Sequence, residues 1–226
     1  MKETSQVEHR LSELFAAERT LRAASRALLK APHGEVLSAL RQAVEQANAL
    51  TDEEEQALRL SSIGTLLPEL QGPGAIDLLI DILASDNEDA RDHVGFSLIE
   101  AAQERPGDVQ KGIERALKRL PSGSPALSTL PYVMLGFGDY DVVAAMPLFL
   151  THTDADAVAA AIEVCVELED ERAIAWLEPL AKDSRTVETQ DEQTGDVATI
   201  TIGELASDAI REIKQVSKMF ASADTN

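Results

Sequence analysis

Apolar residues recur at helical spacing along most of the chain, in segments separated by turns that contain glycine and proline. Residues 3–31 carry one such stripe, which Pro32 and Gly34 end: Val7, Leu11, Leu14, Phe15, Leu21, Leu28 and Leu29. A second stripe covers about 35–50. Spacings of three and four residues predict amphipathic α-helices. We expect residues 1–50 to form a pair of long helices that caps the rest of the chain or serves as a docking element.

From residue 51 onward the pattern repeats about every 33 residues. Alanines near predicted helix starts mark the period at Ala57, Ala90 and, two periods later, Ala157. Four units follow from it, at about 51–84, 86–120, 122–151 and 153–182. A repeat of this length built from two helices predicts a stacked α-solenoid, in which each unit is stabilised by its neighbours. The third unit is degenerate, because three prolines interrupt it: Pro125, Pro131 and Pro147.

The pattern changes after Asp183. Two segments of alternating β-branched residues, 186–190 and 197–202, flank the polar stretch 191–196. This arrangement predicts a β-hairpin over 186–202, followed by a closing helix to about Val216. The predicted organisation is therefore an N-terminal helical pair (1–50), a repeat region (51–216) and a frayed tail (217–226).

Several segments of the repeat region resemble a known family. The segment Asp86-x-x-x-Ala90-Arg91, followed by Val94 and Leu98, looks like the first helix of a HEAT repeat, and residues 153–164 look similar. The ending, 186–213, is similar to the closing unit of many bacterial HEAT-like proteins. The resemblance implies an all-α fold, an α-α superhelix with a small β-hairpin near the C-terminus. It also implies that second helices line a concave, partner-binding face, which would carry these carboxylates: Asp77, Asp81, Glu114 and Glu178.

Charge is distributed unevenly along the chain. The net charge is −20, yet residues 1–50 hold seven Lys/Arg and six Asp/Glu, which leaves 13 bases and 34 acids, or −21, for the remainder. Many of these acids fall at predicted helix starts, where they complement free amides and the helix dipole. The excess that remains repels nucleic acid and anionic membranes, so we expect neither as a partner. A basic protein surface is the expected partner.

The chain has one cysteine, Cys165, in an apolar run, which predicts a buried structural thiol and excludes an internal disulfide. The N-terminal residues are polar and lack the apolar segment of a signal peptide. The longest apolar stretch, Val142 to Leu150, is too short to span a bilayer. These features lead us to expect a cytoplasmic protein.

No motif for a reaction was found in the sequence. A phosphate-binding loop and a nucleophile elbow are both missing from it, and Asp154-x-Asp156 lacks the remaining residues of a calcium loop. The four histidines are scattered, so we expect no metal and no cofactor. With 40 acids in the chain, a catalytic carboxylate pair could be chosen anywhere. We therefore expect a protein without enzymatic activity.

The leading hypothesis is a non-catalytic protein–protein interaction scaffold or adaptor with an acidic repeat surface. Aromatic residues of the degenerate unit are the candidate anchors for a partner: Tyr132, Phe137 and Tyr140. One alternative is an immunity-type inhibitor of a basic toxin. Another, in the enzyme class, is a HEAT-like bilin lyase or a related cofactor-handling protein.

The N-terminal stripe leaves the oligomeric state open. Its residues Val7, Leu14, Leu21 and Leu28 lie seven apart, which suits a coiled coil, although Glu18 and Ser25 interrupt the companion positions. Packing of this helix onto the first repeat is the favoured interpretation. A monomer and a weak homodimer are both compatible with the sequence.

Overall fold

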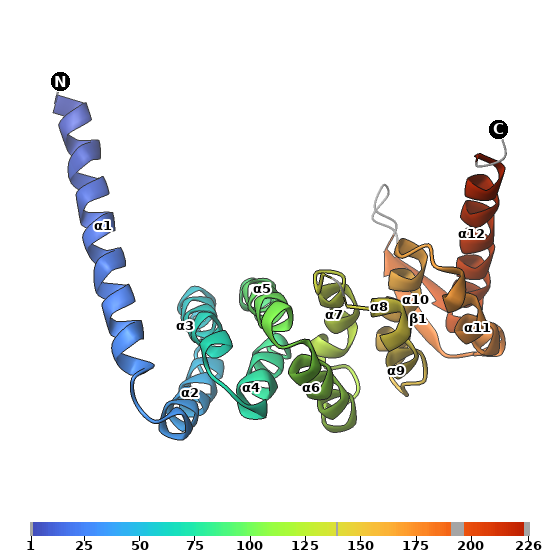
Figure 1. Cartoon of the computed structure of the whole chain (residues 1–226), viewed down its shortest axis with the longest axis horizontal. Coiled ribbons are helices and arrows are strands. Elements are labelled where there is room, and N and C mark those ends of the chain that lie inside the picture. The colour runs from blue at the N-terminus through green and yellow to red at the C-terminus, as the bar shows by residue number, and fades with distance from the viewer. Residues whose placement is uncertain (1, 139, 191–196, 224–226) are drawn as a thin grey trace.

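The protein is an all-α stack of helix pairs with one small β-hairpin near its C-terminus (Figure 1). The structure, a computed structural model, describes residues 2–138, 140–190 and 197–223. The pairs follow one another along the long axis, so the two ends of the chain lie at opposite ends of the molecule. The fold class and the solenoid arrangement expected from the 33-residue period are confirmed.

Two layers of helices make up the stack. The first-helix layer contains α3 (Glu53–Leu66), α5 (Glu88–Glu104), α7 (Pro125–Met134) and α10 (Ala155–Glu167). The second-helix layer contains α2 (His33–Asn48), α4 (Pro73–Leu83), α6 (Pro106–Arg119), α8 (Val142–Ala145), α9 (Pro147–Leu150) and α11 (Ile174–Leu177). Short 3-10 turns complete the units: η1 (Leu67–Glu69), η2 (Glu171–Ala173) and η3 (Glu178–Lys182). Within each layer, neighbouring helices pack side by side, as α3 does on α5 and α7 on α10.

Side-chain caps set the starts of three of the first-layer helices, α3, α5 and α10. The carboxylates of Asp52 and Asp154 and the amide oxygen of Asn87 each accept a hydrogen bond from the backbone NH three residues ahead, at 2.9–3.1 Å. Each cap satisfies one of the NH groups that a helix start leaves without a partner. The acids at predicted helix starts therefore have a local structural role, as the sequence pattern indicated.

Hydrogen bonds between repeats reproduce the sequence period. Asn87 donates to the carbonyl of Glu53 at 3.0 Å, Ser122 donates to Asp154 at 2.7 Å, and Arg185 donates to the carbonyl of His152 at 2.8 Å. The partners lie 32–34 residues apart in sequence. One polar group of each unit thus reaches the same part of the next unit, which fixes the stacking register.

The core consists of small and branched aliphatic side chains. Helices α4 and α10 are buried around most of their circumference, as expected for the central members of a stack. Glycine allows the closest crossings: a Cβ on Gly112 would lie 2.4 Å from Cγ2 of Ile76, and one on Gly64 would lie 2.6 Å from Cγ2 of Val94. Cys165 is fully buried on α10, and burial raises the pKa of its thiol to about 12.

The third repeat is irregular, as its prolines predict. Pro131 lies inside α7, and the second helix of the unit is divided into α8 and α9 before Pro147. Proline removes a backbone NH and disfavours the helical conformation of the residue before it, which explains both features.

The N-terminal helices do not form the separate pair that the sequence suggested. Helix α2 belongs to the second-helix layer and packs on α3 and α4, with Val36, Leu40, Val44 and Ala47 buried. Helix α1 (Lys2–Leu28) instead projects away from the stack (Figure 1). The expectation that α1 packs onto the first repeat is therefore wrong, because the turn at residues 29–32 directs the helix outward.

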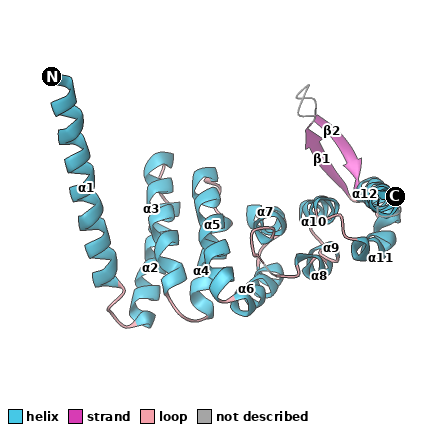
Figure 2. Cartoon of the chain, turned by 45° about the horizontal axis from the view of Figure 1, so that its top comes forward, coloured by secondary structure: helices cyan, strands magenta, loops and turns pink. Residues whose placement is uncertain are grey.

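The C-terminal end is closed by the hairpin and a long helix (Figure 2). Strands β1 (Thr186–Gln190) and β2 (Val197–Thr201) are antiparallel, with Val187 opposite Ile200. The predicted turn at 191–196 lies outside the described residues. Helix α12 (Ile202–Ala223) continues past the predicted end at 216, because it remains in contact with the stack there: the Ser217 hydroxyl donates to Glu171. Among the described helices, none has the length and apolar character needed to cross a membrane.

Candidate protein-binding site

Large apolar side chains are exposed on the first-helix layer. Leu58 on α3, Phe96 on α5 and Tyr132 on α7 are 61%, 73% and 41% exposed. They come from three consecutive units. Among the large apolar side chains of the described residues, Phe96 is the most exposed. Packing within the stack therefore does not explain an aromatic residue at this position.

A groove runs beside Phe96 where α5 meets α7. Its volume is about 420 Å³, and its lining is mainly apolar: Arg91, Asp92, Gly95, Phe96, Ile99, Thr129, Tyr132 and Val133. Gly95 forms its floor, since a Cβ there would lie 3.4 Å from Cγ2 of Val133. The walls belong to two different repeats, so the stacking register described above also sets the width of the groove.

The rim of this groove is acidic. The Tyr132 hydroxyl donates a hydrogen bond to Glu163 on α10. Burial and this hydrogen bond both raise the pKa of Tyr132, and the phenol is protonated at neutral pH. Asp92 lies at the opposite wall. The one basic residue of the lining, Arg91, is turned inward and donates to the carbonyls of Ser85 and Asp86, at 3.0 Å each.

The carboxylates predicted for binding lie on the second-helix layer, where two of them are already paired. Asp77 on α4 accepts hydrogen bonds from Arg115 on α6, at 2.8 and 3.0 Å. Asp81 lies 2.6 Å from Arg119 and 3.7 Å from Arg41. These pairs join three stacked helices and place three arginines beside two aspartates. A binding role for Asp77 and Asp81 stays a prediction, and a partner would meet these arginines as well.

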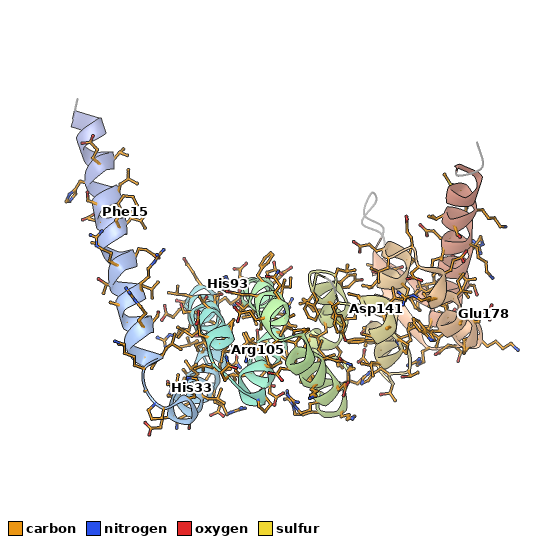
Figure 3. All side chains as sticks on the ribbon, viewed as in Figure 1. Phe15, His33, His93, Arg105, Asp141 and Glu178 are labelled. Carbon is orange, nitrogen blue, oxygen red and sulfur yellow. The ribbon has the colours of Figure 1, made fainter. Side chains whose placement is uncertain are left out.

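The other two predicted carboxylates lie elsewhere. Glu114 on α6 is partly buried and accepts a hydrogen bond from Gln110 at 3.3 Å. Glu178 is exposed in η3, toward the end of the stack that carries α12 (Figure 3). The structure therefore brings Asp77 and Asp81 together on one helix face and does not gather all four residues at one site.

The three candidate aromatic anchors differ in exposure. Phe137 is only 4% exposed and contacts Tyr140 edge-on, with 5.9 Å between ring centroids. Phe137 fills the irregular core of the third repeat, so its prediction as a surface anchor is corrected. Tyr140 is partly buried; burial and the nearby Glu114 and Asp141 carboxylates raise its pKa. Only Tyr132 has the exposed position expected of an anchor.

Sequence reasoning missed Phe96, although a signal for it exists. Residues 92 and 100 lie one turn to either side of it on the same helix face, and both are exposed acids, Asp92 and Glu100. A large apolar residue between them interrupts a solvent-facing stripe. Within the described residues, histidine, cysteine and carboxylate side chains do not form a group of three that could hold a metal ion.

Comparison with known proteins gives no family. No protein-family model matches the chain, and no curated protein does. Among solved structures, the chain is similar to a crystal structure of an engineered protein from the Northeast Structural Genomics Consortium. The two share 19% sequence identity over 85% of this chain and 90% of the other, with a TM-score of 0.30.

Proposed function

We propose that this protein is a non-catalytic scaffold that binds a basic protein segment along its first-helix layer. The observation that supports this most directly is Phe96, a large apolar side chain 73% exposed beside a mainly apolar groove. Exposed apolar clusters with polar rims are typical of protein interaction sites. In such sites a few aromatic anchors supply most of the binding free energy.

The charge of the rim suggests the kind of partner. Asp92 lines the groove, Glu163 accepts the hydrogen bond of Tyr132 beside it, and Arg91 is engaged with backbone carbonyls. Acidic groups at the edge of an interface speed encounter with a basic partner and favour it over an acidic one. We therefore infer a partner segment that offers apolar side chains to the groove and Lys or Arg to its rim. The resemblance to HEAT-repeat proteins agrees with a binding role, although it points to the other layer.

Selection from a displayed peptide library tests this proposal. The baits are the wild-type protein, Phe96→Ser and Gly95→Ala, which places a methyl group in the groove. Leu148→Ser is the matched control, because Leu148 is 37% exposed on α9, in the other layer. We expect the wild type and the control to enrich peptides with basic residues around apolar ones. Phe96→Ser should weaken the selected peptides about 30-fold or more, as loss of a central anchor does.

Equal enrichment on all baits would place binding outside the groove. In that case Asp77→Asn with Asp81→Asn tests the second-helix layer instead. A visible absorbance band in the purified protein would argue against the scaffold and for the cofactor-handling alternative.

A further inference from the structure

Helix α1 has an apolar stripe that nothing in its own chain covers. Every described side chain from residue 6 to residue 24 is exposed, and Val7, Leu14, Phe15 and Leu21 are each 56–60% exposed. The helix has 27 residues, which makes it about 40 Å long. Most helices in proteins depend on packing of their apolar face for stability. Figure 3 shows Phe15 on this helix, well clear of the stack.

The hydroxyl side chains along α1 do not oppose packing, and the one charged interruption of the stripe, Glu18, is paired with Arg22 at 2.6 Å. The hydroxyls of Ser12, Thr20 and Ser25 each donate to the backbone carbonyl four residues earlier, at 3.0 Å. Their hydrogen-bonding capacity is largely satisfied within the helix, so burying them costs little. Ala17 and Ala24 lie three residues after Leu14 and Leu21 on the same face. The stripe therefore alternates large and small side chains, which can interdigitate with a second stripe of the same kind.

Charge along α1 is divided between its two halves. Residues 6–18 contain Glu8, Glu13 and Glu18 with one base, Arg10. Residues 19–30 contain four bases and no acid: Arg19, Arg22, Arg26 and Lys30. In an antiparallel pair centred between Leu14 and Ala17, Glu8 of each copy lies beside Arg22 of the other, and only Glu13 and Glu18 lie opposite a like charge. A parallel pair would set like charges together, and opposed like charges are destabilising.

The remainder of the chain favours the same orientation. Residues 51–226 carry a net charge of −21. In an antiparallel pair these acidic bodies lie at opposite ends of a helix about 40 Å long, several Debye lengths apart at physiological ionic strength. In a parallel pair they would lie side by side and repel each other.

A cleft at the base of α1 provides room for the end of the second helix. It has a volume of about 550 Å³ and lies between α1 and the end of α3, where Leu21, Leu29 and Leu66 supply apolar surface. Arg22 and Arg26 also line it. Glu18 and Glu69 line it as well, so the charge of the cleft is mixed. Its leucines match the apolar Val7 and Leu11 in the N-terminal half of α1.

We propose that two copies of this chain associate through their α1 helices in antiparallel orientation. The pair is centred between Leu14 and Ala17, so that Val7 of each copy faces Ala24 of the other. The end of each helix enters the cleft at the base of the other. This association is independent of the groove between α5 and α7, which remains exposed in both copies.

Sedimentation equilibrium of the full chain tests the association, in a series from about 1 to about 100 μM. We expect the mass to rise toward twice the monomer value of 24.4 kDa. Glu8→Lys, and separately Arg22→Glu, should each raise the dissociation constant about tenfold or more. An equimolar mixture of the two variants should restore association, which simple misfolding of either one would not allow. A wild-type mass of 24.4 kDa throughout the series would overturn the proposal.

Disulfide trapping tests the orientation. Gln6→Cys and Ser25→Cys face each other in the antiparallel register, and the buried Cys165 does not compete for oxidation. We expect a mixture of these variants to form the mixed disulfide faster than either variant links to itself. Faster self-linkage of each variant would indicate a parallel pair and contradict the proposed orientation.

Discussion

The two terminal helices, α1 and α12, are both long and carry apolar stripes, yet only α12 is packed. Helix α12 buries Ala206, Ala209 and Ile213 against the end of the stack, where it contacts α10 and η3. Helix α1 leaves Val7, Leu14 and the rest of its stripe in solvent. A packed helix therefore covers one end of the solenoid, whereas at the other end α2 presents its own polar face to solvent and α1 stays apart.

The difference lies in how the chain enters each helix. At α12, the amides of Ile202 and Gly203 donate to the carbonyls of Arg185 and Asp183, at 2.8 and 2.9 Å. Thr201 and Glu204 form reciprocal capping hydrogen bonds at 3.0 and 3.1 Å. These contacts hold the start of α12 against the stack. The turn from α1 into α2 has only local backbone hydrogen bonds among the described residues, and Leu29 and Ala31 are its partly buried contacts with the core.

Truncating one buried residue of α12 and one exposed residue of α1 should give the largest contrast. We expect Ile213→Ala to lower the free energy of unfolding by about 2–4 kcal/mol, because it leaves a cavity in a packed interface. Leu14→Ala should change it by less than about 0.5 kcal/mol at concentrations where the chain is monomeric. Urea unfolding followed by circular dichroism measures both. Equal losses would show that α1 packs on its own chain.

A substitution at Gly203 tests whether entry geometry fixes α12. A Cβ there would lie 2.9 Å from the carbonyl oxygen of Ala181 and 3.0 Å from that of Asp183. Because both contacts are to backbone, Gly203→Ala should cost about 1–3 kcal/mol of stability. Gly34→Ala is the matched control at the start of α2, since a Cβ there meets nothing within 4 Å. Thermal unfolding distinguishes the two variants, and equal melting temperatures would contradict the argument.

Hydrogen bonds to Asp154 join the third and fourth repeats, and they should make the packed region sensitive to acid. Burial opposes ionisation of this carboxyl, but hydrogen bonds from the amides of Ala157 and Gly123 and from Ser122 outweigh it, so its pKa is lowered from 3.8. A lowered folded-state pKa stabilises the fold above about pH 4, and that stabilisation is lost as pH falls further. Asp154→Asn should therefore lose about 1–2 kcal/mol at pH 7 and show a shallower decline below pH 4. Urea unfolding at pH 7 and pH 3 measures the free energy of unfolding of both proteins. An equal loss of stability between the two pH values in the wild type and the variant would contradict the role given to Asp154.

Surface ion pairs should give the smallest effect and the same effect in both helices. Glu18 and Arg22 lie 2.6 Å apart on α1, and Asp208 and Arg211 lie 2.8 Å apart on α12. Both pairs are exposed, so Glu18→Gln and Asp208→Asn should each change stability by less than about 0.5 kcal/mol. A larger effect in α12 alone would show that charge, in addition to burial, separates the two helices.

Much of the fold could be predicted from the sequence because its causes are local or periodic. The alanine spacing predicted the stack, and Pro131 and Pro147 predicted the irregular third repeat. The acids expected at helix starts include the two caps Asp52 and Asp154. The position of α1 could not be predicted in this way. An apolar stripe indicates that a face is to be covered, but the direction of the turn before α2 decides whether its own chain can cover it.

The candidate site was predicted less well than the fold. Tyr132 was identified from its aromatic character, but the same reasoning also selected Phe137, which is buried. Exposure depends on which side of α7 and its irregular continuation each ring occupies, and prolines disturb that periodicity. The groove itself requires two helices from different repeats, so no single segment contains its signal.

Placing the groove between two repeats has a mechanical consequence. Most contacts in this stack join neighbouring repeats, with α4 also touching α7, so bending of the whole molecule is mainly the sum of small rotations at successive joints. The joint between α5 and α7 is one of these hinges, and its rotation moves the two walls of the groove apart or together. The stack is therefore compliant beside its most exposed aromatic ring, Phe96. A force applied at the two ends of the chain would change the width of this groove.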